Sequence, residues 1–275
     1  MIVKTFCFLT VVTIYLNAQQ TSVANAKILV DSFSFEKSRV IPIGILIDLE
    51  KNWHIYWRNS GDSGMPTSIE YDLPEGITVS QIQWPAPKVF EFDGLASFGY
   101  EKQVLLIAEL NIPKNFKSNS VLITAKLKSL ICRDVCIPFN ANVSKEIKLT
   151  NEFLAEEEIS KLLSQTRIHL PEIKNDFELS VVPEEDNIIL TVMNLNFELL
   201  KINSLYFLPY ENGIFKNTAM QNFKIKDDKI ELIVEYDQFK SAKLKELFGI
   251  LVFHFNDAAQ SQKVYEIKKQ INTNN

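Results

Sequence analysis

Two cysteines separated by three residues, Cys132 and Cys136, are the side chains of this sequence best suited to chemistry. They lie in residues 130–138, which read LICRDVCIP. Two thiols at this spacing can form a disulfide that is either a structural crosslink or a redox group exchanging electrons with other thiols. The 275-residue chain has one more cysteine, Cys7, in a segment that we expect to be removed.

The first 26 residues have the pattern of an export signal. Lys4 supplies a positive charge, residues 5–16 are apolar, and Ala24-Asn25-Ala26 fits the small-x-small cleavage rule, with Lys27 as the new N-terminus. The apolar run is shorter than the roughly 20 residues that span a bilayer, so we expect a soluble mature chain without a transmembrane segment. Export takes the cysteine pair to an oxidising compartment, where disulfides form.

Spacing alone leaves the role of the cysteine pair open. A disulfide that closes a loop of about five residues removes about 2 kcal/mol of unfolded-state entropy, against about 4–5 kcal/mol for a loop of a hundred. A domain of more than a hundred residues has a core and depends little on such a crosslink. Arg133 favours a thiolate and Asp134 opposes it, so the local charge does not decide between redox group and crosslink.

A second motif, Gly61-Asp62-Ser63-Gly64-Met65-Pro66, looks like the nucleophile segment of trypsin-type serine proteases, and His54 lies nearby. That family places its histidine and aspartate far upstream, whereas only 62 residues precede Ser63 here. We therefore interpret the segment as a polar loop with a tight backbone. His54, beside Trp53, Tyr56 and Trp57, is interpreted as part of a packed aromatic cluster.

Metal and cofactor sites are not indicated by the sequence. The three histidines lie in distant segments, so they do not combine with the cysteine pair at ligand spacing. Two thiolates can hold a soft ion such as Cu(I), but no methionine or histidine lies within five residues of either cysteine to complete that site. We expect no cofactor and no metal.

Composition limits the remaining classes. The formal net charge is -5, which argues against nucleic acid or an anionic membrane surface as a partner. Apolar residues make up 46% of the chain, with 19 Phe, enough for an extensive hydrophobic core. The length suits one large or two ordinary domains.

The periodicity predicts an all-β fold: an immunoglobulin-like antiparallel sandwich followed by a second β-domain, joined by a short helix. We expect strands over residues 40–49, 104–110, 121–130 and 143–149, then a helix over residues 151–167 that Pro171 ends. Further strands are expected over residues 177–182, 187–193, 223–226, 229–235, 250–255 and 264–271. The predicted divisions are 1–26 (signal peptide), 27–150 (sandwich with the cysteine pair), 151–171 (helical linker) and 172–275 (second β-domain).

Four blocks of sequence, in order, carry a resemblance to a known family. They read WHIYWRN followed by GDSG (residues 53–64), WPAP (84–87), FGYE (98–101) and CRDVCIP (132–138). Together they resemble the N-terminal periplasmic domain of DsbD-type thiol:disulfide interchange proteins. The three-residue spacing of the cysteines is that of the ScsB-like branch, associated with copper tolerance, whereas DsbD itself has five. Leu205 to Tyr210 also resembles the stretch that follows in ScsB-like proteins.

The resemblance implies an immunoglobulin-like sandwich whose cysteine pair carries electrons from a membrane domain to oxidised periplasmic proteins. It implies that Cys136 engages the substrate and that Cys132 resolves the mixed disulfide. The sequence given contains neither the membrane electron-transfer domain nor the thioredoxin domain of full-length members. We therefore expect separate partners: a membrane electron-transfer protein of the DsbD type and periplasmic thioredoxin-fold proteins. The alternative is a non-catalytic binding or assembly module with a structural disulfide, in copper tolerance or cytochrome c maturation.

The family also implies a loop with an aromatic residue that caps the cysteines. The corresponding stretch here, residues 90–100, contains three Phe, one Tyr and two Gly that can act as hinges. Phe92, followed by Asp93-Gly94, is the first candidate for the cap. Phe98 and Tyr100 are second candidates, with a place in the sandwich core as the alternative for both.

Overall fold

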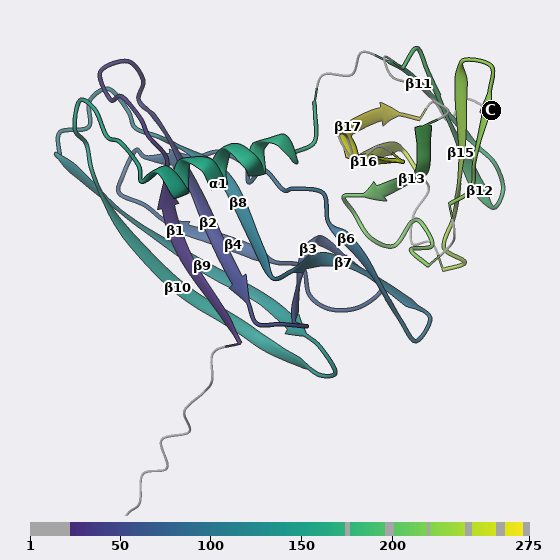
Figure 1. The fold of residues 1–275 in the computed structure, drawn as a ribbon, viewed down its shortest axis with the longest axis horizontal. Coiled ribbons are helices and arrows are strands. Elements are labelled where there is room, and N and C mark those ends of the chain that lie inside the picture. Colours follow the sequence, from purple (N-terminus) through teal and green to yellow (C-terminus); the bar gives the residue numbers. More distant parts are fainter. Residues whose placement is uncertain are drawn as a thin grey trace, which may run out of the picture.

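The computed structural model describes residues 23–173, 177–195, 201–218, 221–239, 244–256 and 262–271, and the part of the chain it describes is almost entirely β. Figure 1 shows an elongated β-sandwich that carries one helix, with a second β-rich part beside one end. The all-β prediction and the immunoglobulin-like architecture are confirmed.

The sandwich consists of two antiparallel sheets. One has the strand order β1-β2-β8-β5, and the other has the order β10-β9-β3-β7-β6, with β4 also paired to β9. The first sheet contains β1 (Ala24–Val30), β2 (Val40–Leu49), β5 (Thr78–Val79) and β8 (Gln103–Asn111). The second contains β3 (His54–Gly61), β4 (Ser68–Asp72), β6 (Lys88–Phe92), β7 (Leu95–Glu101), β9 (Ser120–Cys132) and β10 (Cys136–Lys148).

Strand β9 shows why the sequence forms this sandwich. Alternate residues Val121, Ile123, Ala125 and Leu127 are all at most 1% exposed, while their neighbours face outward, because side chains alternate between the two faces of a strand. Its partner β10 begins at Cys136, seven residues before the predicted start at position 143. Ile137, Phe139 and Ala141 alternate in the same register as Val143 and pack on the core, so the strand pattern extends further toward Cys136 than predicted.

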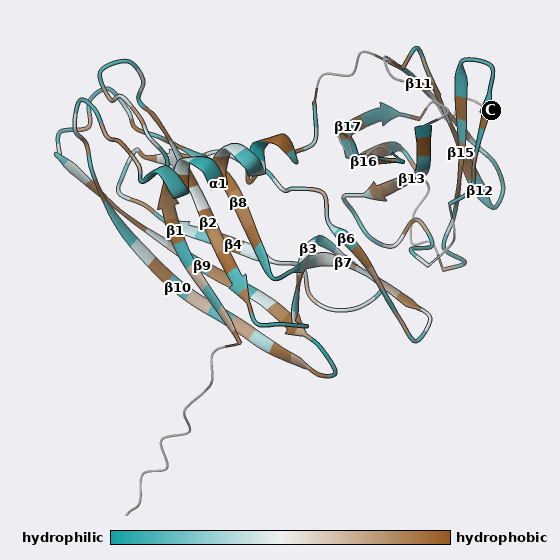
Figure 2. Ribbon diagram, in the orientation of Figure 1, coloured by the Kyte–Doolittle hydropathy of each residue, from teal (hydrophilic) through white to brown (hydrophobic). Residues whose placement is uncertain are grey.

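The single helix of the described chain, α1 (Glu157–Ile168), begins six residues later than predicted. The residues before it are extended, since Phe153 forms a β-bridge with Phe33 and their rings stack at 5.2 Å. Fully buried Leu163 packs against apolar residues of β1, β2 and β8, so the helix covers the first sheet as well as connecting it to the rest of the chain. Figure 1 shows α1 lying across these strands, and Figure 2 shows that the strands are rich in hydrophobic residues.

After the helix, the strands resume in two further antiparallel sheets, which we call the second β-domain. The four-stranded sheet has the order β11-β12-β15-β14, and the three-stranded sheet has the order β13-β16-β17. The strands are β11 (Glu178–Pro183), β12 (Asn187–Met193), β13 (Ile202–Pro209), β14 (Phe223–Lys226), β15 (Lys229–Glu235), β16 (Glu246–Phe255) and β17 (Gln262–Gln270).

The second β-domain has its own core and also contributes to the core of the sandwich. One buried cluster joins sandwich residues such as Trp57 and Phe98 to five residues of β13, β16, β17 and their ends: Leu208, Tyr210, Ile250, Val252 and Val264. The sandwich and the second β-domain therefore meet through a packed apolar interface.

The start of β1 bears on the predicted export signal. Ala24 is buried and pairs with Leu49, and the amide of Glu50 donates to the carbonyl of Val23. Cleavage after Ala26 would remove the first three residues of this strand. The signal segment itself, residues 1–22, lies outside the described residues. Within the described part of the chain, no helix has the length and apolar character needed to cross a membrane.

Candidate redox site at the tip of the β9–β10 hairpin

Cys132 and Cys136 form a disulfide across the end of the β9–β10 hairpin. The two residues are directly paired, with Cα atoms 4.1 Å apart, and the three residues between them form the turn. In that turn the amide of Arg133 donates to the carbonyl of Val135 at 3.1 Å. The long pairing of β9 with β10 thus places the disulfide at an exposed corner of the sandwich.

The two cysteines differ sharply in exposure. Cys132 is 2% exposed, whereas Cys136 is exposed and lies next to Val135, which is 63% exposed. An incoming thiolate must approach a sulfur atom along the axis of the bond that breaks, so access decides which sulfur is attacked. This geometry favours attack at Cys136, with Cys132 as the leaving sulfur.

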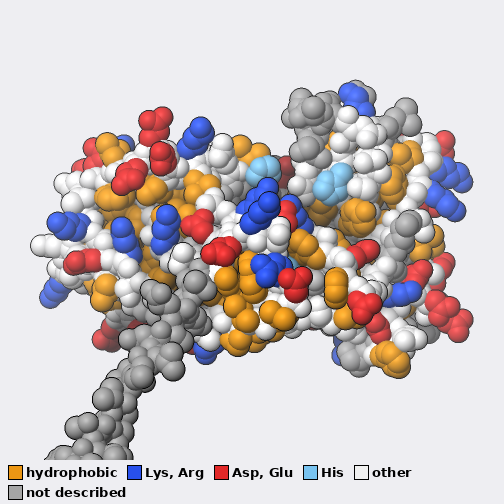
Figure 3. Space-filling view, turned by 60° about the horizontal axis from the view of Figure 1, so that its bottom comes forward, with side chains coloured by type: hydrophobic (Ala, Val, Ile, Leu, Met, Phe, Trp, Pro, Cys, Tyr) orange, Lys and Arg blue, Asp and Glu red, His pale blue; other side chains and the backbone are white. Residues whose placement is uncertain are grey.

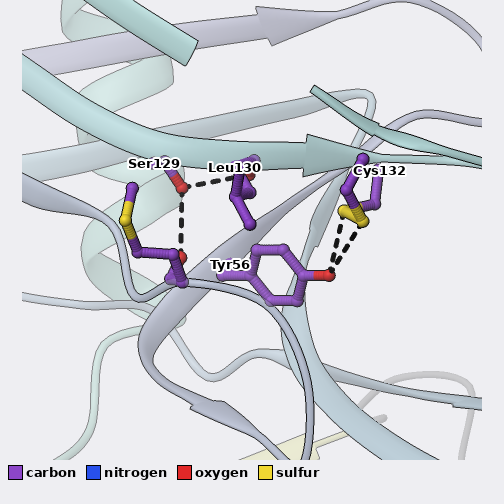
Figure 4. The surroundings of a disulfide bond; sticks show 6 residues. Tyr56, Ser129, Leu130 and Cys132 are labelled. Carbon is purple, nitrogen blue, oxygen red and sulfur yellow. Dashed lines mark hydrogen bonds between the residues drawn. A yellow bond between two sulfur atoms is a disulfide. The ribbon is translucent and has the colours of Figure 1, made fainter. Parts of the chain in front are cut away.

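Tyr56 contacts the disulfide on the outer face of the second sheet, because its neighbours Ile55 and Trp57 face the sandwich core. Its hydroxyl donates to Cys132 Sγ at 3.0 Å and lies 3.9 Å from Cys136 Sγ, as Figure 4 shows. Burial raises the pKa of Tyr56, while a side-chain hydrogen bond with Ser63 opposes the rise. The hydroxyl therefore stays protonated, and a donor, throughout the neutral pH range.

The loop after β3 holds the Tyr56 ring in place. Gly64, with φ of +86°, packs directly on this ring, where a Cβ atom would overlap it. Gly61, with φ of +80°, approaches the backbone of Ala96 equally closely. Both glycines are needed because their conformations are left-handed and their contacts leave no space for a side chain. The segment that resembles a protease nucleophile loop is thus a support for Tyr56.

A buried hydroxyl pair anchors the backbone of Tyr56 to β9. Thr67 Oγ1 donates to the carbonyl oxygen of Tyr56 and lies 2.9 Å from Ser129 Oγ. Ser129 is 1% exposed, and its Oγ atom also lies 3.1 Å from the carbonyl oxygen of Leu130. Figure 4 shows Ser129 and Leu130 on the same strand as Cys132, so this network links Tyr56 to the strand that carries the disulfide.

His54 lies directly across the sheet from Cys132, since the two residues are paired in the β3–β9 register. Its ring stacks on Phe90 at 4.8 Å and meets Tyr56 edge-on at 5.3 Å, while its Nε2 atom is buried without a hydrogen-bond partner. Burial lowers the pKa of His54, and Glu101 opposes the shift. The expected aromatic environment of His54 is confirmed, and this environment adjoins the disulfide.

The three predicted cap residues occupy different places. Phe98 is 2% exposed in the sandwich core, and Tyr100 is 7% exposed with its hydroxyl donating to the carbonyl of Pro85 at 2.7 Å, so both fill the core. Phe92 is 83% exposed beside the turn that joins β6 to β7. It shares a strand face with Phe90, two residues earlier, which contacts His54.

Sequence reasoning missed the roles of Tyr56 and Phe90. The sequence places Tyr56 in the aromatic cluster around His54 but does not indicate its contact with the cysteines, although its two-residue spacing from His54 puts both on one face of β3. The position of Phe90 depends on the β6–β7 pairing, which is indicated by Asp93-Gly94, a two-residue turn typical of a β-hairpin, but was not predicted.

Charged side chains of both signs are mixed on the face drawn in Figure 3, and the described residues hold no cluster of metal ligands. Figure 3 shows acidic, basic and hydrophobic side chains interspersed on one face of the molecule. Across the described residues, no three His, Cys, Asp or Glu side chains gather in a group that could hold a metal ion.

A β-sandwich with one buried and one exposed cysteine in a hairpin disulfide has the arrangement expected of a thiol–disulfide exchange domain. The comparisons with known proteins agree with this class. Residues 25–147 match the family described as "Thiol:disulfide interchange protein DsbD, N-terminal", so this part of the chain is similar to the members of that family. None of the curated proteins compared with the sequence matches it.

Solved structures extend the likeness to the second β-domain. The N-terminal periplasmic domain of ScsB from Proteus mirabilis matches with a TM-score of 0.61 and 18% identity, covering 90% of this chain and 92% of that one. At this identity the match shows a shared fold. The reduced N-terminal domain of DsbD from Neisseria meningitidis is also similar, with a TM-score of 0.28 and 8% identity over 46% of this chain and 90% of that one.

Proposed function

We propose that this protein is a periplasmic thiol–disulfide carrier that exchanges electrons through the Cys132–Cys136 couple. Its partners would be a membrane electron-transfer protein of the DsbD type and oxidised thioredoxin-fold proteins of the periplasm. The observation that carries the proposal is the asymmetry of the disulfide: Cys136 is open to a partner, while Cys132 is buried under the Tyr56 hydroxyl.

Reduction of the couple proceeds by two thiol exchanges. A thiolate of the electron donor attacks Cys136 Sγ, forming a mixed disulfide and releasing Cys132 as a thiolate. The Tyr56 hydroxyl, 3.0 Å away, stabilises the negative charge on that sulfur. The second thiol of the donor then attacks its own mixed-disulfide sulfur and releases Cys136, so the donor is oxidised by two electrons and the couple is reduced.

Delivery of the electrons runs in the opposite direction. The Cys136 thiolate attacks the disulfide of an oxidised partner protein, and one partner sulfur leaves as a thiolate. Cys132 then attacks Cys136 Sγ, which restores the intramolecular disulfide and releases the reduced partner. Phe92, exposed at the β6–β7 turn, is our candidate for a cap that limits unspecific exchange between these encounters.

The reduction potential of the couple tests the proposal. In dithiothreitol or glutathione buffers, a carrier should equilibrate at a potential above about -300 mV, the limit typical of inert structural disulfides. Because about 30 mV corresponds to a tenfold change in equilibrium for two electrons, the measurement separates the two roles. A lower potential, or no reduction in the folded state, would favour the non-catalytic module with a structural disulfide.

Trapping of mixed disulfides with partner proteins tests which of the two cysteines engages the partner. Cys132→Ser leaves the exposed thiol at Cys136, and should accumulate mixed disulfides with thioredoxin-fold proteins. Cys136→Ser leaves only the buried thiol, and serves as the matched control that should trap little. Equal trapping by both variants would contradict the assignment of Cys136 as the sulfur that engages the partner.

A further inference from the structure

The second β-domain contacts β3 at the residues that directly follow Tyr56. The Tyr210 ring packs against Trp57 with centroids 5.5 Å apart, and the Arg58 guanidinium lies 4.0 Å above the same ring. Asn59 is 2% exposed, and its amide donates to the carbonyl of Pro209 at 2.8 Å. Three consecutive residues of β3 are thus fixed by the end of β13.

Two asparagines of the second β-domain hold the loop that follows β3. Asn212 Nδ2 donates to the carbonyl of Gly61, and Asn217 Nδ2 donates to Asp62 Oδ1 at 2.8 Å. Asp62 also binds the sandwich, because its Oδ2 accepts from the amide of Ala96 at 2.8 Å and its own amide donates to the Ala96 carbonyl at 2.7 Å. Asp62 therefore joins the second β-domain, the loop and β7 at one point.

The same loop reaches the disulfide through Tyr56. Gly64, two residues after Asp62, packs on the Tyr56 ring. The Tyr56 hydroxyl in turn contacts Cys132 Sγ. An unbroken series of contacts therefore runs from Asn217 to the sulfur that leaves during exchange.

We propose that the second β-domain is part of the redox site, with Asn217 and Asn212 as positioning residues that hold the 61–64 loop on Tyr56. This inference rests on the proposed thiol exchange and assigns a role to the second β-domain within it. A loop held in this way keeps the Tyr56 hydroxyl aimed at Cys132 when that sulfur becomes a thiolate. Looser anchoring spreads the orientations of the ring and weakens this stabilisation.

The test measures the rate at which dithiothreitol reduces the disulfide in the folded, full chain. Asn217→Ala should slow reduction about two- to fivefold, and Asn217→Asp should slow it more because a carboxylate then faces Asp62. Gln270→Ala is the matched control: it removes an amide hydrogen bond to Glu246 within the second β-domain and should leave the rate unchanged. The melting temperature of each variant is measured in parallel.

A double-mutant cycle with Tyr56→Phe shows whether the asparagine acts through Tyr56. If it does, Asn217→Ala should have no effect on the rate once the Tyr56 hydroxyl is absent. The inference would be overturned if Asn217→Ala did not change the reduction rate. It would also be overturned if Asn217→Ala lowered the rate by the same factor in wild type and in Tyr56→Phe. Either result would leave the proposed exchange intact. A wild-type disulfide that resists reduction in the folded state would overturn both.

Discussion

Removing the hydroxyl that contacts the leaving sulfur is the most direct test of the site geometry. Tyr56→Phe deletes this donor and keeps the ring on which Gly64 packs. A hydrogen bond to a charged group contributes about 1.5–3 kcal/mol. If about half of the charge has developed on Cys132 in the transition state, the barrier rises by about 0.7–1.5 kcal/mol. We therefore expect reduction by dithiothreitol to slow about 3- to 12-fold.

The assay is acid-quenched reduction at neutral pH, followed by alkylation of free thiols and mass measurement. Reduction of Tyr56→Phe should remain slower than that of wild type in mildly alkaline solution, because burial raises the pKa of Tyr56 and the wild-type hydroxyl remains a donor. Wild type and variant should react equally fast when unfolded in guanidinium chloride, which controls for the intrinsic reactivity of the disulfide. An equal or faster reaction of folded Tyr56→Phe would refute the role assigned to the hydroxyl.

Three further predictions concern stability, shielding and pH. Changing both Cys132 and Cys136 to Ala should lower the free energy of unfolding by about 2 kcal/mol or less in urea titrations, because the closed loop is short; an aggregated product would contradict this. Phe92→Ala should speed alkylation of reduced Cys136 with little change in melting temperature, since the side chain is 83% exposed; an unchanged alkylation rate would remove Phe92 as the cap. Burial lowers the pKa of His54, so its stabilising contribution is present above about pH 6.5 and is lost as the pH falls through its folded-state pKa. Unfolding titrations at several pH values should show that acidification lowers the free energy of unfolding less in His54→Gln than in wild type. An equal decrease in both proteins would mean that another group causes the pH dependence.

The apolar strands could be predicted from the sequence because their burial alternates on one face. Residues 121–127 are the clearest example, since each alternate side chain enters the core. The first part of β10 shows the same alternation in Ile137, Phe139 and Ala141, but Pro138 interrupts it with a residue that cannot donate to a strand ladder, and the pairing with β9 overrides that local signal. The helix began later than expected since the contact of Phe153 with Phe33 keeps the preceding residues extended.

The cysteine pair could be found from its residue types and spacing, but its surroundings could not. The contact of Tyr56 with Cys132 joins residues 76 positions apart. Its geometry depends on the register of β3 against β9 and on the loop that supports the ring. The same glycines that made residues 61–64 resemble a protease motif are explained by close packing of Gly61 on the Ala96 backbone and of Gly64 on the Tyr56 ring, which only the folded chain reveals.

The sandwich and the second β-domain share a core, so each part depends on the other for the burial of its apolar surface. Tyr210 covers Trp57 from across the interface, so a chain shortened after the helix would expose an aromatic surface and tend to self-associate. The two parts are therefore expected to lose structure together rather than in separate steps. The segment that matches the DsbD family, residues 25–147, is by this reasoning only one portion of a larger cooperative unit.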